Sequence, residues 1–223
     1  MNKKNFEYIN DGEGNNYYKR NFKIYNSNIK KNNTNSRVIQ LLKINNLKPR
    51  SILEIGCVNG NNLSEYQRYL KINKCVGIDL SSMAINDGCK KFKKIKLFKM
   101  SSLDIKNLND NFDLIICSFF LYLLDRDEIF NQFDLIYRKI KTNGHLIIQD
   151  FDPLFKHTNN NRHKKYLKSF KMSYNNFLEE SGLFKLIFKI PDSEQNKNGF
   201  KSNSTSINLL KKINFSKSYP ENI

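Results

Sequence analysis

Residues 51–63 read SILEIGCVNGNNL, and this stretch decides the fold. An apolar strand carries the acid Glu54 near its end, and a turn with Gly56 and Gly60 then opens a helix. In a doubly wound α/β sheet, ligands bind in the crevice beyond the carboxyl end of the first strand. We therefore interpret the stretch as a strand, a ligand-binding turn and a helix.

The chemistry of this turn favours a cationic ligand. A GxGxxG dinucleotide turn starting at Gly56 would need glycines where Val58 and Asn61 stand, and the GK[ST] ending of a P-loop is absent. A buried Glu54 carboxylate would repel a pyrophosphate, whereas it would attract an ammonium or a sulfonium group. We expect a ligand that carries such a group.

Short apolar stretches alternate with helix-like stretches on both sides of the turn. The predicted strands are residues 51–56, 75–79, 95–100, 112–117 and 145–150. Buried strands that alternate with helices are typical of a parallel, doubly wound sheet. A polar connection, a helix and a hairpin around a polar loop follow, at residues 174–180, 184–190, 204–210 and, for the loop, 191–203. The predicted fold is α/β, Rossmann-like and doubly wound, with a mostly parallel seven-stranded sheet and an antiparallel edge hairpin.

The residues before the first strand are predicted to form a helical cap. Helices are expected at residues 17–31 and 36–46, ahead of the stop signal Pro49. The expected organisation is a cap over residues 1–48, a main domain over residues 49–213 and a frayed tail over residues 214–223.

Two further acids follow later predicted strands. Asp79 ends the second strand in CVGIDLS, where a carboxylate can accept two hydrogen bonds from a ribose diol. Asp104 stands in the loop after the third strand, where an adenine amino group would lie. Together with the first turn, these positions predict a nucleoside-bearing ligand.

The composition limits the classes of partner. The 223 residues include 38 Lys and Arg against 21 Asp and Glu, a formal net charge of +17. A nucleic-acid site concentrates its basic residues on one face, but here the excess of Lys and Asn is spread over the whole chain. We therefore expect a small-molecule partner rather than nucleic acid.

The same reading excludes several other classes. No run approaches the roughly 20 apolar residues of a membrane span, and the first residues lack the apolar core of a secretion signal, so a cytoplasmic protein is expected. The cysteines form no CxxC pair, which argues against a disulfide scaffold or a zinc site. No metal site is predicted.

The ordered motifs LEIGCxxG, GIDLS and DxxxL before FDLII resemble those of class I S-adenosylmethionine-dependent methyltransferases, over residues 51–150. The resemblance implies S-adenosylmethionine as the cofactor. It departs from the family at Val58, where the usual third glycine is replaced by a residue whose Cβ narrows the turn or demands another backbone angle. By the resemblance, the methionine part is held by Glu54, Gly56 and Gly60, the ribose by Asp79 and the adenine by Leu103 and Asp104, with Cys57, Leu80, Cys117 and Ser118 completing the pocket.

The flanking segments have a narrower resemblance. GNNYYKRN at residues 14–21, LDRD at residues 124–127 and DFDP at residues 150–153 look like segments of bacterial methyltransferases from surface-glycan and nonulosonic-sugar gene clusters. This resemblance implies that Tyr17 and Arg20 lie on one face of a helix that caps the cofactor. Arg20 would then pair with the methionine carboxylate.

Methyl transfer from a sulfonium is an in-line displacement that needs positioning, plus a base when the nucleophile is a hydroxyl. Asp150, Asp152 and His157 are the candidate bases, and His163 follows in the same connection. CSFF after the fourth strand lacks the Pro-Pro-aromatic run of enzymes that act on adenine amines. The leading prediction is methylation of a hydroxyl or amine on a small polar metabolite, such as a sugar or sugar precursor. An RNA methyltransferase and a degenerate binding or scaffold protein stay as alternatives.

Overall fold

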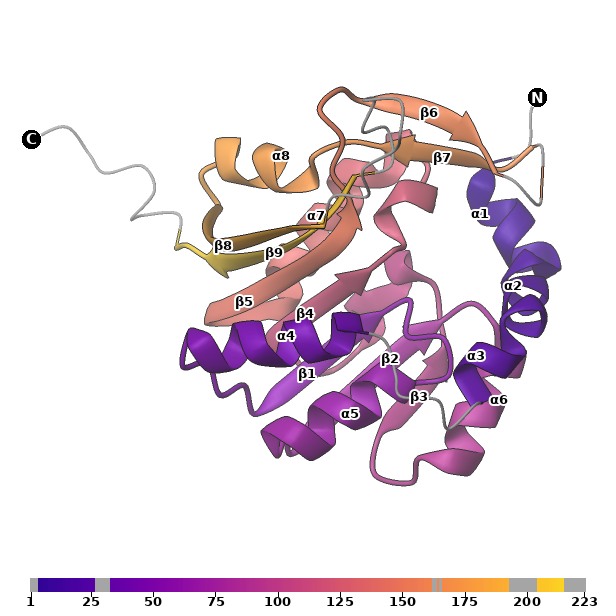
Figure 1. Cartoon of the computed structure of the whole chain (residues 1–223), viewed down its shortest axis with the longest axis horizontal. Coiled ribbons are helices and arrows are strands. Elements are labelled where there is room, and N and C mark those ends of the chain that lie inside the picture. Colours follow the sequence, from indigo (N-terminus) through magenta and orange to yellow (C-terminus); the bar gives the residue numbers. More distant parts are fainter. Residues whose placement is uncertain (1–3, 27–32, 162–163, 165, 193–203, 215–223) are drawn as a thin grey trace, which may run out of the picture.

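The structure is a computed structural model, which describes residues 4–26, 33–161, 164, 166–192 and 204–214. In this part of the chain, a central seven-stranded sheet has the order β3-β2-β1-β4-β5-β9-β8 (Figure 1). Strands β1 to β5 are parallel to one another, whereas β9 is antiparallel to both β5 and β8. The predicted doubly wound fold with its edge hairpin is confirmed. The strands are β1 (Ser51–Ile55), β2 (Lys74–Asp79), β3 (Lys96–Lys99), β4 (Phe112–Ser118), β5 (Ile140–Phe151), β8 (Phe184–Asp192) and β9 (Thr205–Lys212).

Helices cover both faces of this sheet. Leu53 belongs to one apolar core, under α7 and α8, while its neighbour Ile52 belongs to the opposite core, under α4, α5 and α6. Successive side chains of a strand point to opposite faces, so a strand buried on both sides reads as one continuous apolar run. The elements around the sheet are α4 (Asn33–Ile44), α5 (Asn61–Leu70), α6 (Ser82–Lys91), η2 (Ser102–Asn107), η3 (Leu121–Leu123), η4 (Arg126–Glu128), α7 (Ile129–Lys139) and α8 (Tyr174–Glu180).

The N-terminal cap differs from its prediction. The helix expected at residues 17–31 is wrong in its bounds, and residues 27–31 of it lie outside the described residues. The chain instead forms α1 (Asn5–Tyr8), a π-helical turn η1 (Ile9–Glu13), α2 (Gly14–Arg20) and α3 (Phe22–Asn26). The break falls at Asn21, whose side-chain amide donates to the Tyr17 carbonyl at 2.9 Å and so competes with the helix backbone.

The second cap helix also shifts. It was expected at residues 36–46, but α4 starts at Asn33 and ends at Ile44. Asn46 takes a left-handed φ of 54°, which ends the helix.

The connection after β5 is not only a loop. It contains a two-stranded hairpin of β6 (His157–Asn160) and β7 (Lys168–Lys171), which the sequence pattern did not predict. In Figure 1 this hairpin lies above the carboxyl ends of the central strands, and β7 extends toward α1. Most of the predicted loop 191–203 and of the predicted tail 214–223 falls outside the described residues.

No helix in the described ranges has both the length and the apolar character that crossing a membrane would need.

Candidate functional site

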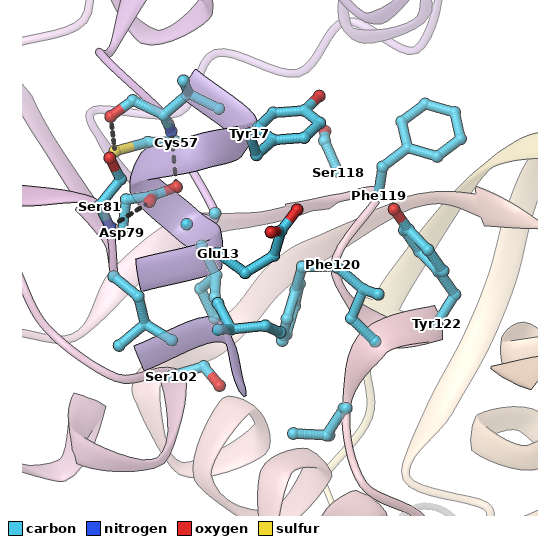
Figure 2. A pocket seen from close by; sticks show the side chains of 18 of the residues that line it. Glu13, Tyr17, Cys57, Asp79, Ser81, Ser102, Ser118, Phe119, Phe120 and Tyr122 are labelled. Atoms are coloured by element: carbon cyan, nitrogen blue, oxygen red, sulfur yellow. Dashed lines mark hydrogen bonds between the residues drawn. The ribbon is translucent and has the colours of Figure 1, made fainter. Parts of the chain in front are cut away.

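A cavity of about 880 Å³ lies at the carboxyl ends of the parallel strands, under the N-terminal helices and the β6–β7 hairpin. Figure 2 shows Asp79 and Ser81 on one side of it, Phe119 and Tyr122 on the other, and the Glu13 side chain between them. It is lined by eight of the predicted cofactor residues, Tyr17, Arg20, Gly56, Cys57, Asp79, Leu80, Leu103 and Ser118.

The remaining predicted cofactor residues do not line the cavity. Glu54, Gly60 and Cys117 are buried next to residues that do, and Asp104 is exposed. Next to Leu103 the cavity is also lined by Met100, Ser101 and Ser102, and Ser102 begins the 3-10 turn η2.

The turn after β1 has three residues in the left-handed region, Gly56 (φ 76°), Val58 (φ 53°) and Gly60 (φ 75°). A Cβ at Gly60 would lie 2.9 Å from Ile95 and 3.0 Å from Leu97, so both side chains would have to shift, and the left-handed φ also favours glycine there. The backbone N–H groups of Gly56 and Cys57 donate to the Ile78 carbonyl, which ties the turn to β2.

Val58 takes a left-handed backbone angle, with φ 53°, of a kind that glycine adopts without strain. A left-handed conformation costs a residue with a Cβ roughly 1–2 kcal/mol. The Val58 N–H donates to Asp79 Oδ2 at 2.9 Å, and this hydrogen bond holds the conformation.

Asp79 connects the turn to the cavity. Its Oδ2 accepts from Val58 N and its Oδ1 accepts from Ser81 N at 2.8 Å. Burial raises the pKa of this carboxyl to about 6, although hydrogen bonds from backbone N–H groups oppose the rise. A carboxylate has about four acceptor positions, so Asp79 keeps acceptor capacity for a hydroxyl group in the cavity.

Glu54 is fully buried behind the turn, with an exposure of 0%. Asn62 Nδ2 lies 3.4 Å from its Oε1, and its Oε2 has no hydrogen-bond partner in the described ranges. Burial raises the pKa of Glu54 to about 8, and the nearby charge of Asp79 adds to the rise. A cation in the adjoining cavity would favour the ionised form of this carboxyl.

The N-terminal cap brings in a residue that sequence reasoning missed. Glu13 lines the cavity and accepts a short hydrogen bond from Arg20, the residue expected to meet the methionine carboxylate. Its Oε2 is buried with no partner among the residues that the structure describes. Tyr17 OH lies 3.1 Å from Tyr25 OH on the same wall. The seven-residue spacing between Glu13 and Arg20, two helical turns, was the available signal in the sequence.

One buried asparagine holds the cap in place. The Asn5 side chain donates to the carbonyls of Leu123 and Lys168, both at 2.8 Å, and accepts from Lys168 N at 2.9 Å. The backbone N–H groups of Asn5 and Phe6 donate to the Asp125 carboxylate. These contacts join α1 both to β7 and to the loop after β4.

The three candidate bases lie outside the cavity lining. Asp150 is buried, and its carboxylate accepts from the backbone N–H groups of Leu121 at 3.0 Å and of Phe151 at 2.7 Å. Burial raises the pKa of Asp150 to about 7, against the opposing effect of these hydrogen bonds. These contacts support a structural role for Asp150, which is to hold the loop after β4.

Asp152 and His157 are also engaged elsewhere. Asp152 accepts from Ser173 Oγ at 2.5 Å and pairs with Lys189 at 2.5 Å; burial alone would raise its pKa, but these partners bring it below the usual value. His157 Nδ1 lies 2.9 Å from the Phe155 carbonyl. His163 lies outside the described residues.

Beyond Ser118 the cavity is walled by aromatic rings and amides. Phe119 has a left-handed φ of 51°, held by a 2.8 Å hydrogen bond from its N–H to the Gln149 carbonyl. The ring of Phe151 meets Tyr122 edge to face, with 5.1 Å between the ring centroids, and meets Phe119 in the same way at 6.2 Å. The hairpin contributes the polar residues Asn159, Asn160, Asn161, Ser169 and Lys171.

Comparison with known families identifies the class. A family model described as a methyltransferase domain matches residues 25–185, more than half of the chain. The chain belongs to this methyltransferase family and is a class I S-adenosylmethionine-dependent methyltransferase. Its cofactor is S-adenosylmethionine, consistent with the acceptor positions left at Asp79 and the unpartnered oxygen of Glu54.

Solved structures share the fold at low sequence identity. The N-methyltransferase NodS from Bradyrhizobium japonicum WM9 has a TM-score of 0.62 and 16% identity, over 82% of this chain and 96% of that one. A 1,6-didemethyltoxoflavin-N1-methyltransferase from Burkholderia thailandensis reaches a TM-score of 0.70 at 10% identity, over 94% of this chain and 89% of that one. An S-adenosylmethionine-dependent methyltransferase from Clostridium acetobutylicum has a TM-score of 0.64 at 16% identity, over 90% and 99%. No curated protein matches the sequence.

Proposed function

We propose that this methyltransferase transfers the methyl group to a hydroxyl or amine of a small polar metabolite, with a sugar or sugar precursor as the leading candidate. The observation that carries the proposal is the composition of the cavity lining, which includes both the amides of the hairpin and a group of aromatic rings. Amides hydrogen-bond hydroxyl groups in both directions, and aromatic faces pack against the C–H faces of a sugar ring.

The cofactor, when bound, supplies an electrophilic methyl group on a sulfonium. The residues of the chain position the two reactants around it. Asp79 can accept the ribose hydroxyls, and the buried Glu54 favours positive charge near the turn. Ser118 Oγ is buried with no hydrogen-bond partner in the described residues, at the boundary between the two parts of the cavity.

Positioning supplies most of the rate enhancement in this proposal. Orientation of two bound reactants can lower a barrier by about 7–11 kcal/mol. Asp150, Asp152 and His157 are held outside the cavity lining. Their contacts therefore support a structural role for these residues rather than a role in proton transfer. An amine acceptor, which attacks as the free base, fits a site of this kind.

The test is a transfer assay with S-adenosylmethionine labelled on its methyl group. The acceptors are neutral sugars, amino sugars and nucleotide sugars, with a short RNA as the comparison. We expect label in at least one sugar class and none in the RNA. Label in the RNA alone would refute the proposal and revive the RNA alternative.

A further inference from the structure

Glu13 is a buried acid of the N-terminal cap that lines the cavity, with an exposure of only 7%. The cofactor contacts expected from the sequence do not include it. A carboxylate is costly to bury unless its oxygens are paired, because its charge leaves water. Arg20 donates to Oε1, but Oε2 is buried with no hydrogen-bond partner among the residues that the structure describes. One oxygen of this acid is thus left for a ligand.

The cap spans the cavity between two anchors, and Glu13 lies between them in the chain. At one end, Asn5 hydrogen-bonds the loop after β4 and the strand β7. At the other end, Ser81 Oγ donates to Asn15 Oδ1 at 2.9 Å, where β2 has ended and α6 begins. Because both ends are fixed, the position of Glu13 over the cavity is fixed as well.

The backbone turns directly before Glu13. Gly12 has a φ of 125°, a conformation outside the helical region, although the residues on both sides of it are helical. Glycine adopts such an angle readily because it has no Cβ. In Figure 2 the Glu13 side chain points from the cap into the space between Asp79 on one side and Phe119 and Tyr122 on the other. The acid therefore reaches the middle of the cavity rather than its rim.

The surroundings of the Glu13 carboxylate fit an amine. A carboxylate oxygen accepts hydrogen bonds and attracts positive charge. The rings of Phe119 and Tyr122, which line the same space, add to this attraction, because a ring face is negatively polarised. A hydroxyl acceptor would need a base to take its proton, and the three candidate bases lie outside the cavity lining.

We propose that Glu13 binds the amine of the acceptor through Oε2, so that the acceptor is an amine rather than an alcohol. This inference rests on the proposed function, because it narrows the acceptor class of the same cavity. Glu13 determines specificity for the amine and orients it; Arg20 holds the other oxygen of the carboxylate in place.

The charge of Glu13 also suits the transfer step. The lone pair of the neutral amine forms the new bond to the methyl carbon, while the electron pair of the carbon–sulfur bond goes to sulfur. Positive charge therefore moves from sulfur to nitrogen. A fixed carboxylate beside the nitrogen stabilises this charge where it develops. The product ammonium then releases its extra proton to solvent.

The experiment measures the melting temperature of the protein saturated with S-adenosylhomocysteine at neutral pH. The probes are glucosamine, with N-acetylglucosamine and glucose as its uncharged counterparts, and ethanolamine, with ethylene glycol as its counterpart. Sodium chloride brings all solutions to equal ionic strength. We expect an amine to raise the melting temperature by about 2–4 °C more than its counterparts.

Matched variants locate the effect. Glu13→Gln keeps the size of the side chain but removes its charge, so it should abolish the extra shift. Glu7→Gln, which removes an exposed acid from α1 of the same cap, should keep it. An equal extra shift in wild type and Glu13→Gln overturns the proposal, and so does the absence of an extra shift with both amines.

Calorimetry with S-adenosylhomocysteine tests the other occupant that a free carboxylate could bind, the ammonium group of the cofactor itself. We expect Glu13→Gln to weaken this binding less than threefold. A larger loss would assign Glu13 to the cofactor and overturn the proposal.

If Glu13→Gln does not fold, carbodiimide coupling in wild type replaces it. This reagent joins an amine to a carboxylate, and peptide mass mapping locates the product. Coupling of the better amine to Glu13 should saturate as the amine concentration rises, whereas coupling to the exposed Glu7 should rise in proportion. Coupling at Glu13 that is absent or does not saturate overturns the proposal.

Failure of the proposed function gives a different pattern. An extra shift with ethanolamine but none with any sugar would leave the amine site standing and remove the sugar acceptor. Equal shifts with glucose, glucosamine and N-acetylglucosamine, and none with ethanolamine, would do the reverse.

Discussion

The two parts of the cavity are built in different ways. The cofactor part, at the ends of β1 and β2, consists of a left-handed turn and of acids that belong to the strands themselves, such as Asp79. The part beyond β4, where we propose that the acceptor binds (the acceptor part), is lined by the loop after β4 and the β6–β7 hairpin. Local sequence encodes the first part, whereas contacts between distant segments create the second.

The largest effect is expected from a substitution in the cofactor part of the cavity. Asp79→Ala removes the acceptor for the ribose and also the carboxylate that holds Val58 N and Ser81 N. We expect the affinity for S-adenosylhomocysteine to fall at least 100-fold, about 3 kcal/mol, by isothermal titration calorimetry. Asp110→Ala removes a surface acid paired with Lys74 and serves as the control, with less than a threefold change. Unchanged affinity in Asp79→Ala would mean that the ribose lies elsewhere.

The free energy of unfolding should depend on pH through Glu54, the buried acid behind the turn of the cofactor part. The folded-state pKa of Glu54 is about 8, above the unfolded value near 4.3, so the folded state holds a proton that the unfolded state releases. Its contribution to stability is therefore present below about pH 4 and is lost as the pH rises toward 8. For a shift of this size, urea unfolding should show a decrease on the order of 4 kcal/mol between pH 5 and pH 8.

The matched variant for this pH dependence is Glu54→Gln. It should flatten the decrease but leave some of it, because burial also raises the pKa values of Asp79 and Asp150. Glu180→Gln, on the exposed end of α8, should keep the full slope. A Glu54→Gln slope equal to that of wild type would show that this carboxyl does not hold the proton.

A smaller effect is expected where the two parts are joined. Asn5→Ala removes the side-chain hydrogen bonds to Leu123 and Lys168, each worth about 1 kcal/mol. We expect a loss of about 2 kcal/mol in chemical denaturation, together with faster proteolysis of the first 20 residues in limited trypsin digestion. Asn16→Ala, on an exposed position of α2, is the control. Equal stability of both variants would contradict the proposed anchoring.

The smallest effect is expected from a substitution at Val58, in the left-handed turn of the cofactor part. Val58→Gly releases the left-handed strain at the turn but adds backbone entropy to the unfolded chain. We expect a net gain of about 0.5–1 kcal/mol in the free energy of unfolding, measured by urea denaturation. A loss of stability would mean that contacts of the valine side chain outweigh the strain.

The same contrast explains what the sequence could predict. Strands such as β1 and β4 are continuous apolar runs, and the Asp79 position follows from the end of such a strand, so that the fold and the cofactor turn were readable. The β6–β7 hairpin could not be predicted, because the sequence of β6 is HTNN and has no alternation of apolar and polar residues. Its register depends on pairing with β7. The sequence did not predict that Glu13 and Lys171 line the cavity, for a related reason. Each reaches the cavity only through packing between distant segments.

Glu54 shows a different limit of sequence reasoning. The sequence placed its carboxylate beside a cationic ligand, whereas the structure puts it behind the turn, outside the cavity lining. Strand alternation could not distinguish these two positions, because β1 is buried on both faces. The effect of this acid on the ligand is therefore electrostatic and acts across the turn.

The anchoring of Asn5 has a consequence for the order of biosynthesis. Asn5 is synthesised well before its partners, because Leu123 and Lys168 follow it by 118 and 163 residues. At about 5–20 residues per second, the N-terminal segment waits roughly 10–30 s for its docking site. The parallel strands β1 to β5 are all synthesised before Lys168, so the sheet can form while the cavity is still open. The nascent enzyme acquires its closed binding site as one of its last steps, after the polar hairpin has been made.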